Sequence, residues 1–180
     1  KKKPLPTLYQ TINATLYDNI QGRLSRRSTM GSQYSHMYMT FRLFRFDAAG
    51  NFEMFGNDHA EPVICRGETG EVIPLDSRGF LMGILDEAIQ GDESHVFQLM
   101  PGDLLVLYSD GITEAKSMSR AASRGGEIER ELYGEQRLHT IIAENRRRSP
   151  GEIIQTILED VDGYMSEQED DITMAVLRKK

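Results

Sequence analysis

Length, composition and charge limit what this chain can be. Its 180 residues are 39% hydrophobic and 27% charged, which is typical of one soluble globular domain that buries a core. The net charge of −7 argues against an electrostatic nucleic-acid-binding protein, because such proteins are usually basic. No apolar run reaches the roughly 18 residues of a membrane span. The single cysteine, Cys65, favours a reducing, cytoplasmic setting, and we expect neither nucleic acid nor a membrane as a partner.

The first predicted element is a helix over residues 7–24. Its apolar side chains recur at four-residue steps and would form one stripe along the helix: Leu8, Ile12, Leu16, Ile20 and Leu24. The residues that follow, 25–36, are rich in serine and arginine and predict a loop.

From residue 37 the hydrophobic period changes to two, which predicts strands. In chain order these strands cover residues 37–46, 52–55, 62–66, 71–75, 96–100 and 103–109. The turn at 47–51 predicts that the first two strands form one antiparallel hairpin, and the GETG turn at 67–70 predicts that the third and fourth form another. Residues 116–130, rich in serine, arginine and glycine, predict a mobile loop.

Two helices and a final strand complete the predicted fold. Residues 133–148 predict one helix, and residues 149–165 predict another that starts with a capping box of Ser149 and Glu152. The last strand is predicted over 172–178. Hairpins together with segregated helices favour an α+β fold over a parallel α/β sheet.

Carboxylates stand at the ends of two predicted strands that are far apart in the sequence. Residues 104–108 are apolar on both alternating sets, so we expect this strand to be covered on both faces, with Asp110 following it. Asp170 and Asp171 precede a second strand that we also expect to be covered on both faces. If these ends meet, the carboxylates would suit a hard divalent cation. The alternative is that Asp-Gly makes an ordinary turn and the adjacent acids are solvated.

Several short motifs occur in order along the chain: PGD at 101–103, SDG at 109–111, EA at 114–115, YGEQRL at 133–138 and DDIT at 170–173. A GNDH turn at 56–59 and a GFLMGI segment at 79–84 lie upstream of them. Together these motifs resemble the bacterial SpoIIE/RsbU branch of the metal-dependent serine/threonine protein phosphatases, the PPM superfamily. One departure is that the GNDH turn lacks the small pair of residues that the family has before its histidine.

The resemblance implies a fold, a chemistry and a set of site residues. The fold would be an α-β-β-α sandwich, two antiparallel sheets with helices outside. Two Mn²⁺ or Mg²⁺ ions in the complete domain would activate a water that attacks the phosphoryl group. By position, Asp110 and Asp170 would be metal ligands. The supporting residues would be Gly111, Asp171, Thr173 and His59, with Thr173 fixing a turn by hydrogen bonding. His59 would act as a general acid or hydrogen bond its own loop.

The acidic motifs with which the family's domain begins are not found in this sequence. We therefore expect residues 1–180 to be a single partial phosphatase domain, without the first strands and first helix. Such a chain alone would hold metal poorly and be weakly active or inactive. Its uncovered sheet edge would favour a homodimer.

The function implied by the resemblance is a phosphoserine/phosphothreonine protein phosphatase of a bacterial signalling pathway. Its substrate would be a phosphorylated protein, in this branch often an anti-sigma-factor antagonist. An upstream sensor or receiver domain would accompany it in the parent protein. The alternative is a pseudophosphatase, or a regulatory phosphoprotein-binding module without catalysis.

Overall fold

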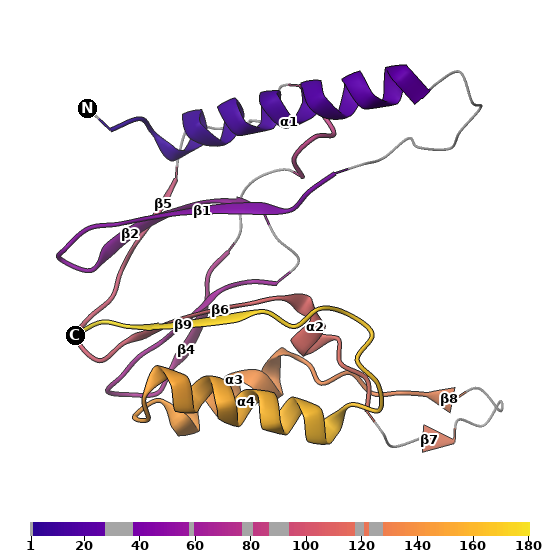
Figure 1. Cartoon of the computed structure of the whole chain (residues 1–180). Helices are drawn as coiled ribbons and strands as arrows, with labels where there is room; N and C mark the ends of the chain where they lie inside the picture. Colours follow the sequence, from indigo (N-terminus) through magenta and orange to yellow (C-terminus); the bar gives the residue numbers. More distant parts are fainter. Residues whose placement is uncertain are drawn as a thin grey trace. The chain divides into compact units, whose positions relative to one another are not determined.

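The structure is a computed structural model that describes residues 2–27, 38–57, 60–76, 81–86, 94–117, 121–122 and 128–180. The chain forms two compact units, one of residues 1–59 with 76–98 and one of residues 60–75 with 99–180. Each unit has its own antiparallel sheet and at least one long helix (Figure 1). The predicted α+β class with two antiparallel sheets is therefore confirmed, and the single partial domain over 1–180 stays a prediction.

The first unit combines a long helix with a three-stranded sheet of order β1-β2-β5. Its elements are α1 (Leu5–Arg27), β1 (Phe41–Phe46), β2 (Asn51–Asn57) and β5 (His95–Gln98). All neighbouring strands are antiparallel, and β1 and β2 form the hairpin that the sequence predicts. Phe41 and Leu43 pack into the cluster under α1, as their shared face in the predicted strand requires.

The buried side of α1 is rotated from the predicted stripe. Leu5, Tyr9 and Asn13 are at most 3% exposed, whereas Leu8 and Ile12 of the predicted stripe only border the cluster. Ile20, also in the stripe, is buried. Asn13 is fully buried, and its Nδ2 donates to the carbonyl of Leu85 at 2.8 Å while its Oδ1 accepts from the Gly83 amide at 2.9 Å. A satisfied polar side chain thus occupies a core position, which a search for apolar periodicity alone does not find.

The second unit is built on a four-stranded sheet of order β4-β3-β6-β9. Its strands are β3 (Val63–Cys65), β4 (Val72–Pro74), β6 (Leu104–Tyr108) and β9 (Met174–Arg178). All three pairings are antiparallel. β6 is an interior strand, and Leu104, Leu105 and Val106 have no exposed surface, so its predicted burial on both faces is confirmed.

The prediction that the last strand is also covered on both faces is wrong. In β9 the side chains alternate, with Met174 and Val176 packed against the core and Ala175 and Leu177 exposed. Its only pairing among the described strands is with β6, so it lies at the edge of the sheet. An edge strand is less enclosed, and one of its faces can remain open even when its sequence is largely apolar.

Helices cover one face of the second sheet (Figure 1). They are α2 (Asp110–Thr113), α3 (Glu135–Asn145) and α4 (Pro150–Tyr164). The predicted capping box is present, since the Ser149 amide donates to Glu152 at 2.9 Å and the Ser149 hydroxyl accepts from the Glu152 amide. Among the described helices, none combines the length and the apolar character needed to cross a lipid bilayer.

The predicted mobile loop over 116–130 contains paired backbone where it is described. Two short strands, β7 (Ala121–Ala122) and β8 (Ile128–Glu129), pair with each other. Lys116 bridges to Leu132, and Ser117 bridges to Met165. These pairings tie the segment that follows α2 to the end of α4.

Candidate functional site

Strand pairing brings the predicted site residues to one end of the second sheet. β6 and β9 are antiparallel, and Tyr108 at the end of β6 pairs with Met174 at the start of β9. Asp110 follows the first strand and Asp170 precedes the second, so both acids adjoin the same end of the sheet. The expectation that these two segments meet is confirmed. The metal-binding role of the two aspartates stays a prediction.

Ser109 joins the two segments directly. Its hydroxyl donates to the carbonyl of Asp171 at 2.9 Å and accepts from the amide of Thr173, also at 2.9 Å. Its own amide donates to the Thr173 carbonyl at 2.9 Å. Sequence reasoning did not assign this role to Ser109, although a hydroxyl residue at a strand end beside Asp-Gly is the available signal. The turn is fixed through the backbone of Thr173 rather than through its side chain.

Gly111 is the second point of close approach. A Cβ atom at this position would lie 2.6 Å from the carbonyl oxygen of Asp171 and 3.4 Å from that of Asp170. Real Cβ atoms do not approach oxygen so closely, so only glycine fits without moving the chain. The supporting role expected for Gly111 is thus a packing role, which lets the Asp170–Asp171 backbone lie against the start of α2.

The carboxylates at this end are largely uncommitted. Asp110 is half-buried, and its side chain makes no hydrogen bond or ion pair with any described residue. Asp170 and Asp171 are exposed, and Asp170 Oδ1 accepts one bond, from the Asp171 amide at 2.7 Å. Carboxylate oxygens that the fold does not use remain available to an external cation or donor.

These donors are of the kind that a divalent cation prefers, but they are too few for two ions. Mg²⁺ and Mn²⁺ prefer oxygen ligands, and one such ion can be held by one or two carboxylates completed by waters. Within the described ranges, no group of three acidic, histidine or cysteine side chains is placed to hold a metal. Two carboxylates such as Asp110 and Asp170 would at most suit one weakly held ion and do not by themselves provide a two-ion site. His59, the remaining predicted site residue, lies outside the described residues.

A small cavity of about 80 Å³, lined by several charged residues, lies beside Asp170. Its lining includes Gly111, Lys116, Glu169 and Asp170. Lys116 and Glu169 form an ion pair, and Arg130 lies 3.9 Å from the same glutamate. These charged residues adjoin the candidate site and were not identified from the sequence.

The YGEQRL motif supports the same region from α3. The Tyr133 hydroxyl donates to Asp160 at 2.7 Å, and Arg137 binds the same carboxylate through two nitrogens, at 2.8 and 3.0 Å. Arg137 holds the pKa of Asp160 below its usual range, while burial raises the pKa of Tyr133. The Tyr133 amide also donates to the carbonyl of Ala115 at 2.8 Å. The motif thus anchors the segment after α2 to α3 and α4.

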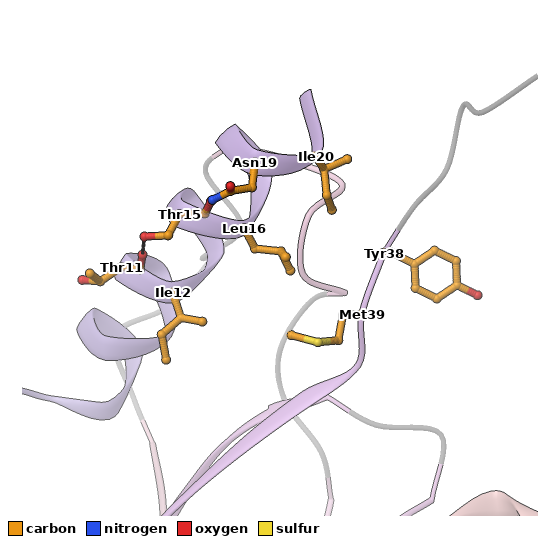
Figure 2. A pocket seen from close by; sticks show the side chains of 8 residues that line it. All are labelled: Thr11, Ile12, Thr15, Leu16, Asn19, Ile20, Tyr38 and Met39. Carbon is orange, nitrogen blue, oxygen red and sulfur yellow. Dashed lines mark hydrogen bonds between the residues drawn. The ribbon is translucent and has the colours of Figure 1, made fainter. Parts of the chain in front are cut away.

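A larger cavity, of about 590 Å³, lies along α1 in the first unit. Figure 2 shows Ile12 and Leu16 pointing from α1 toward Met39, with Thr11, Thr15 and Asn19 along the helix beside them. Among the described residues that line it there is no acid, amine or histidine. The described lining therefore offers no candidate for metal or acid–base chemistry, and the candidate active site is the end of β6 and β9.

Comparisons with known proteins identify the fold. The family model described as Stage II sporulation protein E (SpoIIE) matches residues 1–180. The SiaA-PP2C domain of Pseudomonas aeruginosa has a TM-score of 0.63 at 20% identity, covering 86% of this chain and 56% of that chain. The manganese-presoaked phosphatase domain of SpoIIE from Bacillus subtilis has a TM-score of 0.54 at 23% identity, with coverage of 78% and 56%. No curated protein matches the chain.

A further similar structure contains the RsbU and RsbW domains of a Mycobacterium tuberculosis protein, with a TM-score of 0.53 and 19% identity over 78% of this chain and 36% of that one. At identities of this size, the likeness shows a shared fold. The chain spans 56% of the length of each of the first two structures.

Proposed function

Because the chain belongs to the SpoIIE family, we propose that it is a divalent-metal-dependent protein phosphatase acting on phosphoserine or phosphothreonine. The family resemblance inferred from the motifs is confirmed by the match over residues 1–180. The observation that carries the proposal is the pairing of Tyr108 with Met174, because it puts Asp110 and Asp170 at one end of one sheet.

In this proposal, Asp110 and Asp170 bind the metal, and neighbouring residues keep these two aspartates in position. Mn²⁺ or Mg²⁺, when bound, lowers the pKa of a coordinated water and neutralises charge on the phosphoryl oxygens. The bridge from Ser109 to Asp171 fixes the segment that carries Asp170, and the absence of a side chain at Gly111 leaves room for it. Asp171 then acts by orienting Asp170, because its amide donates to Asp170 Oδ1.

The proposed substrate is a phosphorylated protein, specifically an anti-sigma-factor antagonist in a bacterial signalling pathway. The support for this class is the resemblance to the SpoIIE/RsbU branch and the fold shared with the RsbU-containing structure. A sensor or receiver domain in the same protein and a cytoplasmic location belong to the same proposal.

A second candidate function is a phosphoprotein-binding module without catalysis. The observation that favours it is the lack of a third donor side chain beside Asp110 and Asp170 within the described residues. A site with two carboxylates would still attract a cation and a phosphorylated partner, but it would activate water weakly.

The test is phosphate release from a phosphoserine peptide by the full-length protein, with Mn²⁺, Mg²⁺ or EDTA. We expect release with either metal, none with EDTA, and a loss of at least about 100-fold in Asp110→Asn and Asp170→Asn. Asp162→Asn is the matched control, because Asp162 is exposed on α4 and has no described partner.

The outcomes separate the two candidates. Folded protein that binds the phosphopeptide without releasing phosphate would replace the phosphatase with the binding module. Equal activity in Asp110→Asn, Asp162→Asn and the unmodified protein would remove Asp110 from the site.

A further inference from the structure

We propose that Lys116 and Glu169 are positioning residues that set Asp170 against Asp110, an inference that rests on the proposed function of this site. The two side chains form an ion pair, and both line the small cavity beside Asp170. Glu169 directly precedes Asp170 in the chain, so the place of its side chain constrains the residue that follows it.

The segment that carries Asp170 is held by hydrogen bonds on both sides of this pair. Before it, the Ser166 amide donates to the carbonyl of Lys116 at 3.0 Å, and Arg130 donates to the Ser166 hydroxyl at 2.8 Å. After it, the Ser109 hydroxyl donates to the carbonyl of Asp171 at 2.9 Å. Between these two anchors, Glu169 ties this segment to other parts of the chain in two ways: Lys116 donates a hydrogen bond to its carboxylate, and Arg130 forms a longer ion pair with it at 3.9 Å.

Lys116 is itself fixed to the segment that carries Asp110. It bridges to Leu132, and the preceding residue, Ala115, accepts from the Tyr133 amide at 2.8 Å. Ala115 also donates to the carbonyl of Ile112 in α2, the helix that begins at Asp110. The ion pair therefore links the Asp170 segment to the element that places Asp110.

The pair adds little to folding stability. The side chains of Lys116 and Glu169 are 41% and 49% exposed, and exposed ion pairs typically contribute about 0–1 kcal/mol. Metal ligands, by contrast, must be held within about 0.5 Å of their working geometry. A contact that is almost neutral for stability can thus be important for metal affinity, as residues that orient metal ligands usually are.

The charge of Lys116 and its positioning role predict opposite effects on cation binding when the lysine is removed. If the lysine acted only through its charge, its removal would strengthen the binding of a cation nearby. If it holds Glu169 and thereby Asp170, its removal weakens binding. Removal of Glu169 weakens binding in both cases, so Lys116→Met is the decisive variant and exchange of the two charges is the decisive rescue.

The experiment is calorimetric titration of the full-length protein with Mn²⁺ alone, alongside thermal unfolding. We expect Lys116→Met and Glu169→Gln each to raise the Kd for Mn²⁺ by about 10-fold, with little change in Tm. The double variant Lys116→Glu with Glu169→Lys should bring the Kd back to within about 3-fold of the unmodified protein, because the pair is restored in reverse. Lys180→Met, two residues past the far end of β9, is the charge control and should leave the Kd unchanged.

Two further variants separate the failure of this inference from the failure of the proposed function. If Asp110→Asn and Asp170→Asn bind Mn²⁺ as tightly as the unmodified protein, the metal site itself is wrong and the positioning role falls with it. If those variants lose binding while Lys116→Met binds more tightly or equally, the metal site stands and the positioning role is overturned.

Discussion

Two aspartates flank β6, one at each end, and their carboxylates differ in the hydrogen bonds that they accept. Asp103 precedes the strand and is only 3% exposed. Its carboxylate accepts from Arg66 at 2.6 Å, from the Gly67 amide at 2.9 Å and from the Met100 amide at 3.0 Å. Asp110 follows the strand, and its carboxylate has no partner in the part of the chain that the structure describes.

The difference teaches how to separate structural from functional carboxylates on one strand. The Asp103 carboxylate has a structural role, because it accepts three hydrogen bonds that close the turn at Pro101–Gly102. Asp110 is held in place through its backbone, whose carbonyl accepts from the Glu114 amide at 2.8 Å, while its side chain stays uncommitted. A carboxylate that the fold positions but does not bond is the better candidate for ligand chemistry.

The largest effect is expected from Asp103→Ala. The substitution leaves the Gly67 and Met100 amides and the Arg66 guanidinium without their acceptor, so the free energy of unfolding should fall by about 3 kcal/mol. Urea denaturation measures it, with Asp162→Ala as the exposed control. A loss below about 1 kcal/mol would show that Asp103 is not the structural member of the pair.

Gly111→Ala should follow, with a loss of about 2 kcal/mol, because the new methyl group collides with the Asp171 carbonyl. The matched control is Gly163→Ala in α4, where no atom lies within 4 Å of the added Cβ. That variant should be neutral or stabilising by about 0.5 kcal/mol. Equal stability of the two variants would contradict the close approach at Gly111.

Ser109→Ala should cost about 1 kcal/mol, since it removes the two side-chain hydrogen bonds that join the ends of β6 and β9. Hydrogen exchange provides the specific readout. The Thr173 amide should exchange faster in the variant, while amides within α4 should not change. Unchanged protection at Thr173 would remove Ser109 as the bridge.

A smaller effect is expected in acid. Burial raises the pKa of Asp103, but the bonds from Gly67, Met100 and Arg66 outweigh it and hold the pKa below the ordinary value of 3.8. A depressed carboxyl pKa stabilises the fold above the unfolded value, and this stability is lost as pH falls through the folded value. Unfolding curves below pH 4 should therefore fall less steeply in Asp103→Ala than in the unmodified protein. Parallel curves would contradict the depressed pKa.

The smallest effect on stability is expected from Asp110→Asn, within about 0.5 kcal/mol, because no described contact of its carboxylate is lost. The same variant should lose metal binding and activity, so stability and function separate at this end of β6. A large loss of stability would mean that Asp110, like Asp103, serves the fold.

The sequence predicts the elements that follow from strong local patterns. The apolar run at 104–108 predicts an interior strand, and the position of Asp110 at its end follows directly. Ser149, Pro150 and Glu152 predict the start of α4, because a capping box is a local feature of the chain. The meeting of the segments that carry Asp110 and Asp170 could be predicted because each acid adjoins a strand of the same family pattern.

Polar contacts between distant segments could not be predicted in this way. Asn13 is fully buried, but no apolar pattern marks it, because its partners are backbone groups some 70 residues away. The pair of Lys116 and Glu169 looks like two solvated charges in the sequence, and its partners become neighbours only when β9 docks beside β6. The exposed face of β9 could not be predicted, because the position of a strand at the edge of a sheet depends on the sheet topology and not on the strand's own sequence.

The register between β6 and β9 fixes the number of residues that must separate Asp170 from the start of β9. Tyr108 lies opposite Met174. The residues between Asp170 and Met174 therefore form a connector whose length determines the position of Asp170 relative to the end of β6. Inserting one residue there would either carry Asp170 away from Asp110 or slide β9 by one position and turn Met174 and Val176 out of the core. Chains with this architecture should therefore tolerate changes of side chain in the connector far better than changes in its length.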